Sequence, residues 1–491
     1  MAQSKSEFGF LLKHSSVYGL GNMLSKAVGF VLLPLYTRYL TPTDYGILEL
    51  IEVTSGMIGL LIGFGVTQAV SRFYYEPTNE NDRNRVVSTA YWVATVMTVL
   101  GAGIASLFAV PLSALALDSS RSYQLLLVSF ASLAVGVVLQ LGQLDLLLRY
   151  KSVTYQVISV ISLVLGVSCN VIFIVVFHWG VMAIMVSGLI TRVVVGIPLT
   201  VWTLSRTGLG IDWGLAKQMV RFGGPLVPSS LANTFVNYSD RYFIKTFATV
   251  ADAGLWGLAN KIGTSIHVLL TSPFIMTFLQ RRFEIVKRPD ARPTFARISE
   301  YYLLAITAFG LFTVIFVDEI LRVMTTPAFF SAGALVPWIV FAMVLLGMKY
   351  HFEFGILYEK KTSHYAVINI ATAILHVVLN LILVRAYGVF GAALAAAGTM
   401  AFSTIAVYVA GQRLYSIPFA FDRQVRVVGI AGLLYFASRV VHLPTLAATL
   451  AFKGALFLAF PPLLLLARAV TSEDAGKFRE FFKRGIRRES A

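Results

Sequence analysis

The sequence has few charged residues and almost no cysteine, and these shortages exclude several classes of protein. Only 13% of its 491 residues are charged, whereas 57% are hydrophobic and the mean hydropathy is +0.76. So little polar surface cannot cover a soluble protein of this length. The single cysteine, Cys169, excludes an internal disulfide and a cysteine-based metal site. We therefore expect a membrane protein with no metal.

Motifs of several enzyme classes are also missing. No glycine-rich phosphate loop followed by Lys-Ser or Lys-Thr is present, so we expect no ATP hydrolysis. The first apolar run lacks a small-residue cleavage site, so we expect it to be retained as a helix. A membrane-embedded glycosyltransferase or polymerase would need a large outer loop with paired carboxylates, and no such loop is predicted. We expect a protein that is not an enzyme and needs no cofactor.

What the sequence does contain is a series of long apolar runs. Crossing about 30 Å of hydrocarbon takes about 20 apolar residues in a helix. We predict an all-α polytopic membrane protein with fourteen spans: 15–38, 45–71, 87–110, 123–148, 154–177, 181–204, 222–246, 252–280, 299–323, 332–357, 364–385, 389–412, 425–442 and 446–468.

The lysines and arginines between these spans indicate the orientation. With both termini in the cytoplasm, the predicted outer segments hold five of them: Arg38, Arg121, Lys245, Arg322 and Arg385. Most of the others fall in cytoplasmic segments, as the positive-inside rule requires. This asymmetry accounts for most of the net charge of +16, so nucleic acid is not expected as a partner. The basic tail, residues 470–491, either lies against anionic lipid headgroups or is simply solvated.

The chain contains an internal repeat with an offset of about 208 residues. Thr41 and Asp44 precede one apolar run as Thr249 and Asp252 precede another. At the same offset Asp145 matches Glu353, Tyr150 matches Tyr358 and Gly180 matches Gly388, whereas Lys151, Tyr155 and Asn170 match Lys361, Tyr365 and Asn380 after a two-residue slip. A duplicated helix bundle is typical of secondary transporters, which bind their substrate between the halves.

The repeat predicts the domain organisation. Each copy holds six spans, so both copies enter the membrane from the same side. The predicted parts are an N-terminal six-helix lobe (1–204), a cytoplasmic linker (205–221), a C-terminal six-helix lobe (222–416), helices thirteen and fourteen (417–469) and the basic tail (470–491).

Charged residues inside the spans are the candidate functional residues, because an Arg or Lys near the bilayer centre costs about 2.5–3.5 kcal/mol. Such residues normally face a bundle interior or a water-filled cavity. A cationic, substrate-binding cavity is predicted from five basic residues: Lys26, Arg192, Arg241, Lys261 and Lys349. Charge balance or ion coupling is predicted for four acidic residues: Glu49, Glu52, Asp240 and Glu353. Such a cavity suits an anionic group such as a phosphate or pyrophosphate.

Structural explanations stand beside these functional ones. Asp240 and Arg241 are adjacent, so each is free to pair with a different neighbouring helix. Glu49 and Glu52 share a helix face and are placed to neutralise Lys26 or Lys261. Lys349 and Glu353, four residues apart, have the spacing of an ion pair within one helix. Lys26 and Arg192 have no evident partner in their own helices, so they are the strongest functional candidates.

Two stretches resemble a known family. Residues 15–50, SSVYGLGNMLSKAVGFVLLPLYTRYLTPTDYGILEL, resemble the first hairpin of the polysaccharide transporter family, the Wzx-type oligosaccharide-lipid flippases. Residues 223–244 and 252–262, GGPLVPSSLANTFVNYSDRYFI and DAGLWGLANKI, are similar to that family's seventh and eighth helices. The family belongs to the multidrug/oligosaccharidyl-lipid/polysaccharide exporter superfamily.

The resemblance implies a V-shaped exporter fold of two six-helix lobes that opens to one side at a time. It also implies a polyprenyl-(pyro)phosphate-linked oligosaccharide as substrate, turned from the cytoplasmic to the outer leaflet of the bacterial inner membrane for surface polysaccharide biosynthesis. Membrane lipids, a polysaccharide polymerase and glycosyltransferases of the same pathway are the implied partners. A cation-coupled multidrug antiporter of the related fold and a lipid II flippase remain alternatives, although the many basic residues argue against the antiporter.

Overall fold

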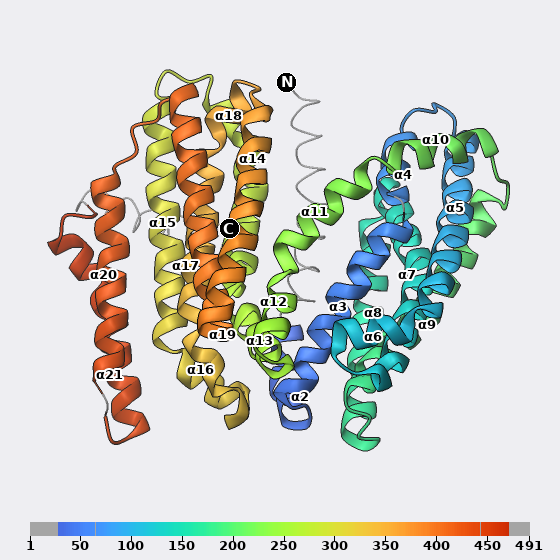
Figure 1. Ribbon diagram of the computed structural model, residues 1–491. Helices are drawn as coiled ribbons and strands as arrows, with labels where there is room; N and C mark the ends of the chain where they lie inside the picture. The colour runs from blue at the N-terminus through green and yellow to red at the C-terminus, as the bar shows by residue number, and fades with distance from the viewer. Residues whose placement is uncertain (1–27, 64, 442, 471–491) are drawn as a thin grey trace, which may run out of the picture. The chain divides into compact units, whose positions relative to one another are not determined.

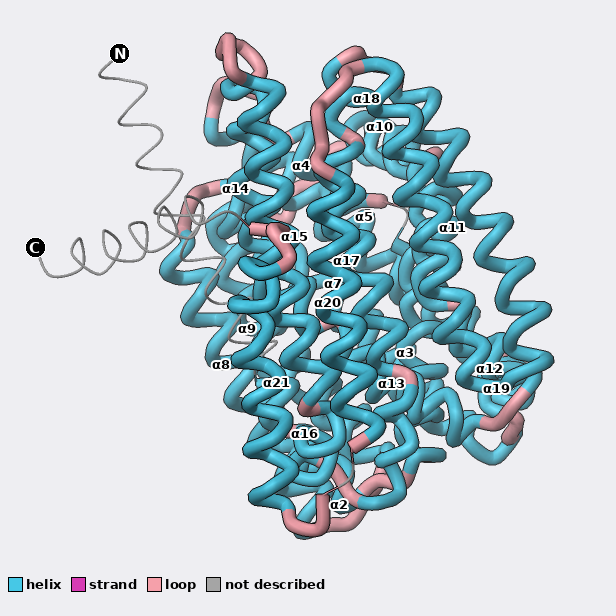
Figure 2. Tube along the Cα trace, turned by 90° about the vertical axis from the view of Figure 1, so that its left-hand side faces the viewer, coloured by secondary structure: helices cyan, strands magenta, loops and turns pink. Residues whose placement is uncertain are grey.

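The computed structural model describes residues 28–470 except 64 and 442. These residues form helices and contain no strand, which confirms the predicted all-α class (Figure 1). Ten of the described helices are long and apolar enough to cross a membrane. Loops and turns lie mainly at helix ends (Figure 2). The chain is therefore a multi-pass membrane protein.

The chain divides into two compact units. Unit 1 contains the described residues up to Leu258, with Met324–Phe329 and Val384–Val389. Its main elements are α2 (Leu33–Tyr39), α3 (Pro42–Gly63), α4 (Val66–Phe73), α5 (Glu80–Leu107), α6 (Ala109–Leu117), η1 (Ser120–Ser122), α7 (Tyr123–Leu148), α8 (Ser152–Val171), η2 (Ile172–Val176), α9 (Val181–Thr207), α10 (Trp213–Gly223), α11 (Leu226–Tyr238), α12 (Asp240–Phe247) and the first part of α13 (Val250–Gly263).

Helix α7 is the centre of unit 1, packed between α5 and α9. In lipid, helix association depends on close packing, for which small residues are favourable. Gly142 of α7 lies against Leu199 of α9, and a Cβ on Gly196 of α9 would lie 3.1 Å from the Cβ of Leu139. Glycine on both helices thus brings α7 and α9 close together along their length.

Unit 2 contains Ala259–Val323, Phe330–Leu383 and the residues from Phe390 onward. Helix α15 is its centre and contacts α14, α17, α20 and α21. After α13, the elements are η3 (His267–Thr271), α14 (Ser272–Ile285), α15 (Ala291–Ile315), α16 (Val317–Met324), η4 (Pro327–Ala334), α17 (Val336–Phe352), α18 (Phe354–Tyr358), α19 (Thr362–Leu414), α20 (Phe421–Val440) and α21 (Leu446–Leu466). The predicted boundaries of lobes, linker and tail remain predictions.

The predicted number of fourteen spans also stays a prediction. Two of the predicted spans, 364–385 and 389–412, lie in α19, which bends at Gly388. The predicted span 222–246 is divided between α11 and α12, and 425–442 corresponds to α20, which is not among the ten candidate helices. The predicted span 15–38 and the basic tail (470–491) both lie largely outside the described residues.

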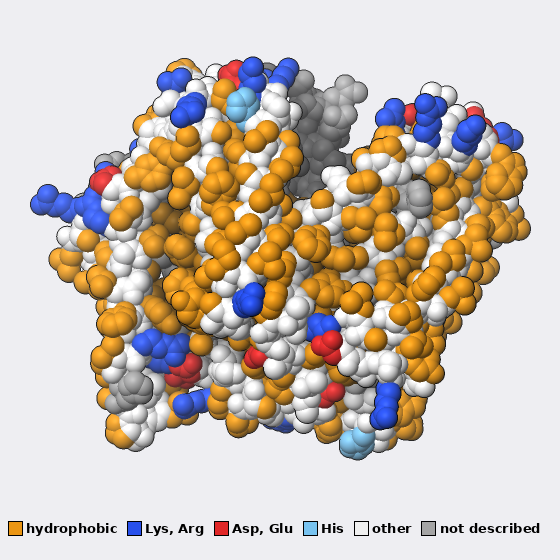
Figure 3. Space-filling view, in the orientation of Figure 1, with side chains coloured by type: hydrophobic (Ala, Val, Ile, Leu, Met, Phe, Trp, Pro, Cys, Tyr) orange, Lys and Arg blue, Asp and Glu red, His pale blue; other side chains and the backbone are white. Residues whose placement is uncertain are grey.

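Helix α8 shows why lipid must be the solvent of this protein. Only 6% of its most apolar stretch is buried inside the protein. Val153, Val164 and Val176 along this span and its extension η2 are 69%, 58% and 66% exposed. Hydrophobic side chains cover much of the visible helix sides (Figure 3). A surface this apolar is stable only against hydrocarbon.

The internal repeat predicted the same local structure twice, and the two copies form it. The Thr41 hydroxyl donates to Asp44 Oδ2 at 2.7 Å, and the Asp44 N–H donates back to Thr41 Oγ1 at 3.2 Å. Thr249 and Asp252 make the same reciprocal bonds at 2.7 and 3.1 Å. Each pair stabilises the N-terminus of its helix as a capping box does. Helices α3 and α13 therefore begin in the same way.

These two helix starts also touch each other. A Cβ on Gly46 would clash with the carbonyl oxygen of Val250, and a Cβ on Gly254 would clash with that of Pro42. Pro42 and Val250 are themselves repeat mates, as are Gly46 and Gly254. The contact is therefore reciprocal, and both glycines are needed for the backbones to approach so closely.

The backbone angles locate the slip in the repeat. Gly180 (φ 56°, ψ −131°) and Gly388 (φ 58°, ψ −141°) share a conformation that favours glycine, at an offset of 208. Tyr150 and Lys360, both with φ 56°, precede Lys151 and Lys361, which cap the next helices in matching conformations. The structural mate of Tyr150 is thus Lys360, and the sequence match to Tyr358 is wrong. The register returns between Asn170 and Gly180, where the first copy has two more residues than the second; the π-helix η2 lies in this stretch, and such a helix typically accommodates one inserted residue.

Candidate functional site

A pocket of about 450 Å³ lies within unit 1. Its size falls in the range of small-molecule sites, about 300–1,000 Å³. Six helices contribute to its lining: Gly56, Gly59, Leu60 and Gly63 of α3; Val66, Thr67 and Gln68 of α4; Thr98 of α5; Leu133, Gly136, Val137 and Gln140 of α7; Arg192 of α9; Leu226, Val227 and Ser230 of α11, with Gly65 between α3 and α4.

Two helix faces form opposing parts of the lining. The α3 residues have the spacing i, i+3, i+4 and i+7, and the α7 residues have the same spacing, so each set lies on one side of its helix. On α3 three of the four are glycines. A Cβ on Gly56 or Gly63 would meet nothing within 4 Å. The pocket is open on this side because side chains are absent.

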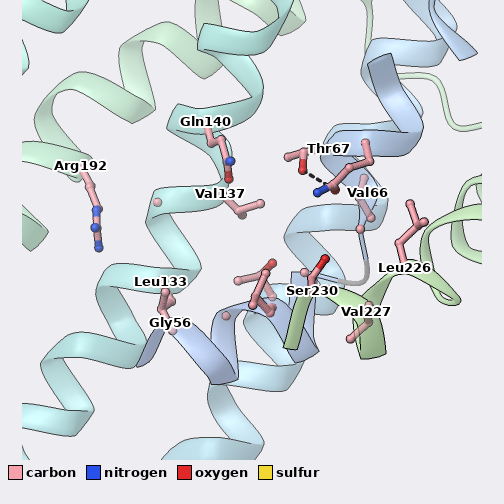
Figure 4. Close-up of a pocket in the computed structure, with 17 residues that line it drawn as sticks. Gly56, Val66, Thr67, Leu133, Val137, Gln140, Arg192, Leu226, Val227 and Ser230 are labelled. Carbon is pink, nitrogen blue, oxygen red and sulfur yellow. Dashed lines mark hydrogen bonds between the residues drawn. The ribbon is translucent and has the colours of Figure 1, made fainter. Parts of the chain in front are cut away.

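The helix is interrupted between α3 and α4, and residues at this interruption complete the lining of the pocket. Gly65 has φ +63°, and a Cβ there would lie 2.8 Å from the carbonyl oxygen of Gly223, so only glycine fits both the backbone angle and the close approach. This interruption allows α4 to begin at Val66 with a different axis direction from α3. Thr67 and Gln68 at its first turn then face the pocket, where the Thr67 hydroxyl donates to Gln68 Oε1 at 2.9 Å (Figure 4).

Arg192 is the one charged residue among the described residues that line the pocket. It lies near the middle of α9, and its guanidinium crosses Gly136 of α7, where a Cβ would lie 3.3 Å from Arg192 Cδ. One guanidinium nitrogen donates to the Ser132 hydroxyl. In the part of the chain that the structure describes, no carboxylate is recorded within ion-pair distance of it. A charge at this depth without a counter-ion normally serves a ligand or an aqueous cavity.

The other polar groups of the lining are uncharged. Thr98 is 3% exposed, and its hydroxyl has no hydrogen-bond partner among the described residues. Gln140 of α7 and Ser230 of α11 both line the pocket (Figure 4). A buried hydroxyl without a partner costs about 1–3 kcal/mol. The pocket therefore offers unsatisfied hydrogen-bonding capacity beside one cation.

Four of the other predicted residues lie elsewhere in unit 1. Arg241 of α12 is 4% exposed, and its Nε donates to Glu49 Oε2 of α3 at 3.0 Å. The Glu49 side chain lies across Gly257, where no side chain interferes. Asp240 is buried and Glu52 is exposed. Arg241 and Glu49 thus form an ion pair between helices instead of lining the pocket.

The predicted residues of unit 2 are arranged differently from the expected helical ion pair. Glu353 pairs with Arg282 of α14 at 3.4 Å, not with Lys349. The ammonium of Lys349 lies 5.4 Å from the centre of the Tyr365 ring, a cation–π distance. Lys261 is exposed on α13. Lys26 lies outside the described residues. Within the described part of the chain, no group of three or more His, Cys, Asp and Glu side chains is arranged to hold a metal.

One end of unit 1 carries a second polar cluster, which is charge-balanced. Asp145 of α7 accepts from Arg149 Nε at 2.6 Å and from Arg206 of α9. Arg149 also bonds Glu80 of α5. Burial opposes the charge of Arg149, but its bonds to Asp145 outweigh this and raise its pKa. The cluster ties three helices together, so we assign it a structural role.

Sequence reasoning missed the neutral part of the pocket because it searched for charges. Gly56, Gly59 and Gly63 carry no chemical group that marks a site. The available signal was their spacing on one helix face, repeated by Leu133, Gly136, Val137 and Gln140 on another. Such a spacing is equally typical of tight helix packing. Only the structure shows that part of the glycine face is open.

Comparisons with known proteins place this fold. The model of a family described as "Polysaccharide biosynthesis protein" matches residues 11–278. A Haemophilus influenzae protein described as "Uncharacterized membrane protein" is 22% identical over 289 residues, covering 57% of this chain and 67% of that protein.

Two solved structures have the same fold. One is the lipid II flippase MurJ in an inward closed conformation, with a TM-score of 0.72, 10% identity, and coverage of 90% of this chain and 97% of that one. The other is an inward-facing multidrug resistance MATE family transporter, with a TM-score of 0.61, 15% identity, and coverage of 80% and 93%. At these identities the likeness shows the fold alone.

Proposed function

The chain belongs to the polysaccharide biosynthesis protein family, and from that membership we propose that it is a flippase for a lipid-linked oligosaccharide. The substrate is a polyprenyl-(pyro)phosphate-linked oligosaccharide, carried from the cytoplasmic to the outer leaflet of the bacterial inner membrane. Both termini lie in the cytoplasm. Glycosyltransferases supply the substrate and a polymerase consumes it. The chain acts as a transporter and not as an enzyme.

The observation that supports this function best is the pocket around Arg192. It combines neutral hydrogen-bonding groups with one cation that has no carboxylate partner among the described residues, and four of the six helices that line it are candidate membrane spans. An oligosaccharide head cannot cross hydrocarbon unaided, because each unpaired polar group costs several kcal/mol there. The pocket supplies partners for hydroxyl groups, and Arg192 supplies a charge-assisted bond to an anionic oxygen.

The transport cycle that fits this substrate is alternating access. The polar head occupies the protein while the prenyl tail stays in lipid. Moving one negative charge outward across a membrane that is negative inside gains about 2.3 kcal/mol per 100 mV. Lys26, Lys261 and Lys349, as further proposed cavity residues, would add positive charge along the path, and Glu52 and Asp240 remain candidates for ion coupling.

The pocket argues against a cation-coupled drug antiporter, because a cationic drug would require acidic groups where Arg192 lies. A lipid II flippase needs the same chemistry as the proposed function. The two are separated by substrate: loss of a lipid II flippase stops cell-wall synthesis, whereas loss of the proposed flippase removes only a surface glycan.

The test is export of surface glycan in a strain that lacks the chromosomal gene and carries a plasmid copy. We expect the deletion to abolish export, and Arg192→Ala or Lys26→Ala to lower it at an unchanged protein level. Arg85→Ala is the control, since Arg85 is outside the pocket and its side chain is 70% exposed. Unchanged export in the Lys26→Ala, Arg192→Ala double variant would show that these cations are not needed. Normal export in the deletion strain would refute the function itself.

A further inference from the structure

The glycines of α3 leave open space on one side of the pocket. Gly56 and Gly63 are separated by two helical turns on the pocket side, and both have free space where a side chain would be. Gly59 between them is tighter, since a Cβ there would lie 3.3 Å from Leu133. Gly59 therefore serves packing between α3 and α7, whereas Gly56 and Gly63 leave volume for a ligand.

The chemistry of this volume favours a sugar over a pyrophosphate. A pyrophosphate carries several negative charges and is bound best by several cations. Here one arginine stands beside five neutral polar residues: Thr67, Gln68, Thr98, Gln140 and Ser230. Hydroxyl and amide groups match the donors and acceptors of sugar hydroxyls. The buried Thr98 hydroxyl, which lacks a partner, independently indicates a polar ligand.

The position of Arg192 indicates which way round a phosphate-linked sugar would lie in the pocket. Its guanidinium reaches the pocket at Gly136, at the edge of the α7 face, while the neutral groups occupy the rest. A phosphate held by Arg192 would place the sugar bonded to it against α3. The pocket volume of about 450 Å³ suits a small part of an oligosaccharide and not a long one.

We propose that this pocket is a subsite for the sugar bonded directly to the lipid phosphate, and that the missing side chains of Gly56 and Gly63 set the largest substituent which that sugar can carry. The inference rests on the proposed flippase function and adds a specificity determinant to it. Filling the space at Gly56 excludes bulky sugars before it excludes small ones.

The experiment reconstitutes the full chain in vesicles with two synthetic probes, polyprenyl-pyrophosphate-linked glucose and polyprenyl-pyrophosphate-linked N-acetylglucosamine. The rate at which each sugar becomes accessible to a membrane-impermeant reagent is measured. We expect Gly56→Leu to slow the N-acetylglucosamine probe about tenfold more than the glucose probe, because steric discrimination by a few atoms is worth at least about tenfold. Gly63→Leu acts in the same direction.

Gly103→Leu is the matched control. Gly103 also lies within a helix, is exposed and has nothing within 4 Å, but it does not line the pocket. We expect it to transport both probes like the unmodified chain. Gln140→Ala, which removes an exposed amide without filling space, is expected to slow both probes equally and keeps the subsite testable if the leucine variants fail to fold.

Three outcomes decide between the proposals. If Gly56→Leu and Gln140→Ala transport both probes normally, the subsite is refuted while the flippase function stands. If Gly56→Leu slows both probes equally while its thermal stability is unchanged, the size limit is refuted. If the unmodified chain moves neither probe, the flippase function fails and the subsite fails with it.

Discussion

Arg192 of α9 and Arg241 of α12 both belong to unit 1, but their surroundings are opposite. Arg241 is 4% exposed and bonded to Glu49 at 3.0 Å, and its guanidinium also lies 5.3 Å from the Tyr238 ring centre. Arg192 bonds one serine hydroxyl and otherwise faces a pocket. Both cations are costly in lipid, but only the first is neutralised by an ion pair recorded in the described structure.

The difference separates a structural charge from a functional one. Removing one partner of a buried ion pair leaves the other charge uncompensated, which is strongly destabilising. Removing a cation that has no counter-ion leaves no uncompensated charge behind. Stability should therefore depend on the pair of Arg241 and Glu49, and transport on Arg192.

The largest effect is expected from Glu49→Ala, which leaves Arg241 buried without its carboxylate. We expect the free energy of unfolding to fall by about 3 kcal/mol, the lower end of the range for broken buried pairs because Glu49 is 21% exposed. Thermal and denaturant unfolding in detergent measure it. Glu76→Ala, which removes an ion pair with Arg72 in which both side chains are more than half exposed, is the control and should change stability by about 0.5 kcal/mol or less. An equal loss in both variants would contradict the structural role of the pair.

Arg192→Ala should show the opposite profile. Loss of one charge-assisted bond to the substrate lowers transport by about tenfold or more, equivalent to about 1.4 kcal/mol. The unfolding midpoint should change little, because no buried acid is left unpaired. Transport in vesicles and unfolding in detergent are measured on the same preparation. A large fall in stability with normal specific transport would place Arg192 with the structural charges.

Gly136→Val tests how Arg192 reaches the pocket. A Cβ at this position already lies 3.3–3.6 Å from three atoms of the Arg192 side chain, so branched methyl groups displace it. We expect transport to fall about fivefold, less than on removal of the charge, because the side chain is flexible and re-orients. Combining Gly136→Val with Arg192→Ala should add little, since both act on one contact. Full additivity would argue for a separate role of Gly136.

Arg192→Lys is expected to have the smallest effect. Lysine keeps the charge but loses the planar set of donors with which Arg192 bonds Ser132 and, by our proposal, an anionic oxygen of the substrate. We expect transport to fall about twofold to threefold, measured in the same vesicle assay. A loss as large as that of Arg192→Ala would mean that donor geometry and not charge is decisive.

The repeat shows how much of the fold can be predicted from sequence. The pattern Thr-x-x-Asp predicts the same cap at Thr41 and Thr249 because capping is local. Gly180 and Gly388 mark the same backbone angle. The residue that corresponds to Tyr150 could not be assigned from residue type. Tyr358 matches it in type at an offset of 208, but the helix end in the second copy is displaced by two residues, so Lys360 has the corresponding backbone angle.

The candidate site could likewise be predicted from the sequence only in part. Arg192 was recognisable because a charge within an apolar run is unusual. The partner of Arg241 was not, since Glu49 lies 192 residues away and its selection depends on how α3 and α12 pack. The same applies to Glu353, which pairs with Arg282, 71 residues away, and not with Lys349 in its own helix. Spacing within a helix indicates which pairs can form, but tertiary packing decides which do.

The reciprocal contact of Gly46 and Gly254 has the geometry of an isologous interface. In a two-fold symmetric dimer, residue i of one subunit contacts residue j of the other while j contacts i. Here Gly46 meets Val250 while Gly254 meets Pro42, within one chain. The α3–α13 crossing is thus what a homodimer of the half-length protein would make. Because both copies belong to one chain, a substitution at Gly46 is not repeated at Gly254, so one contact of the pair can be changed while the other is kept.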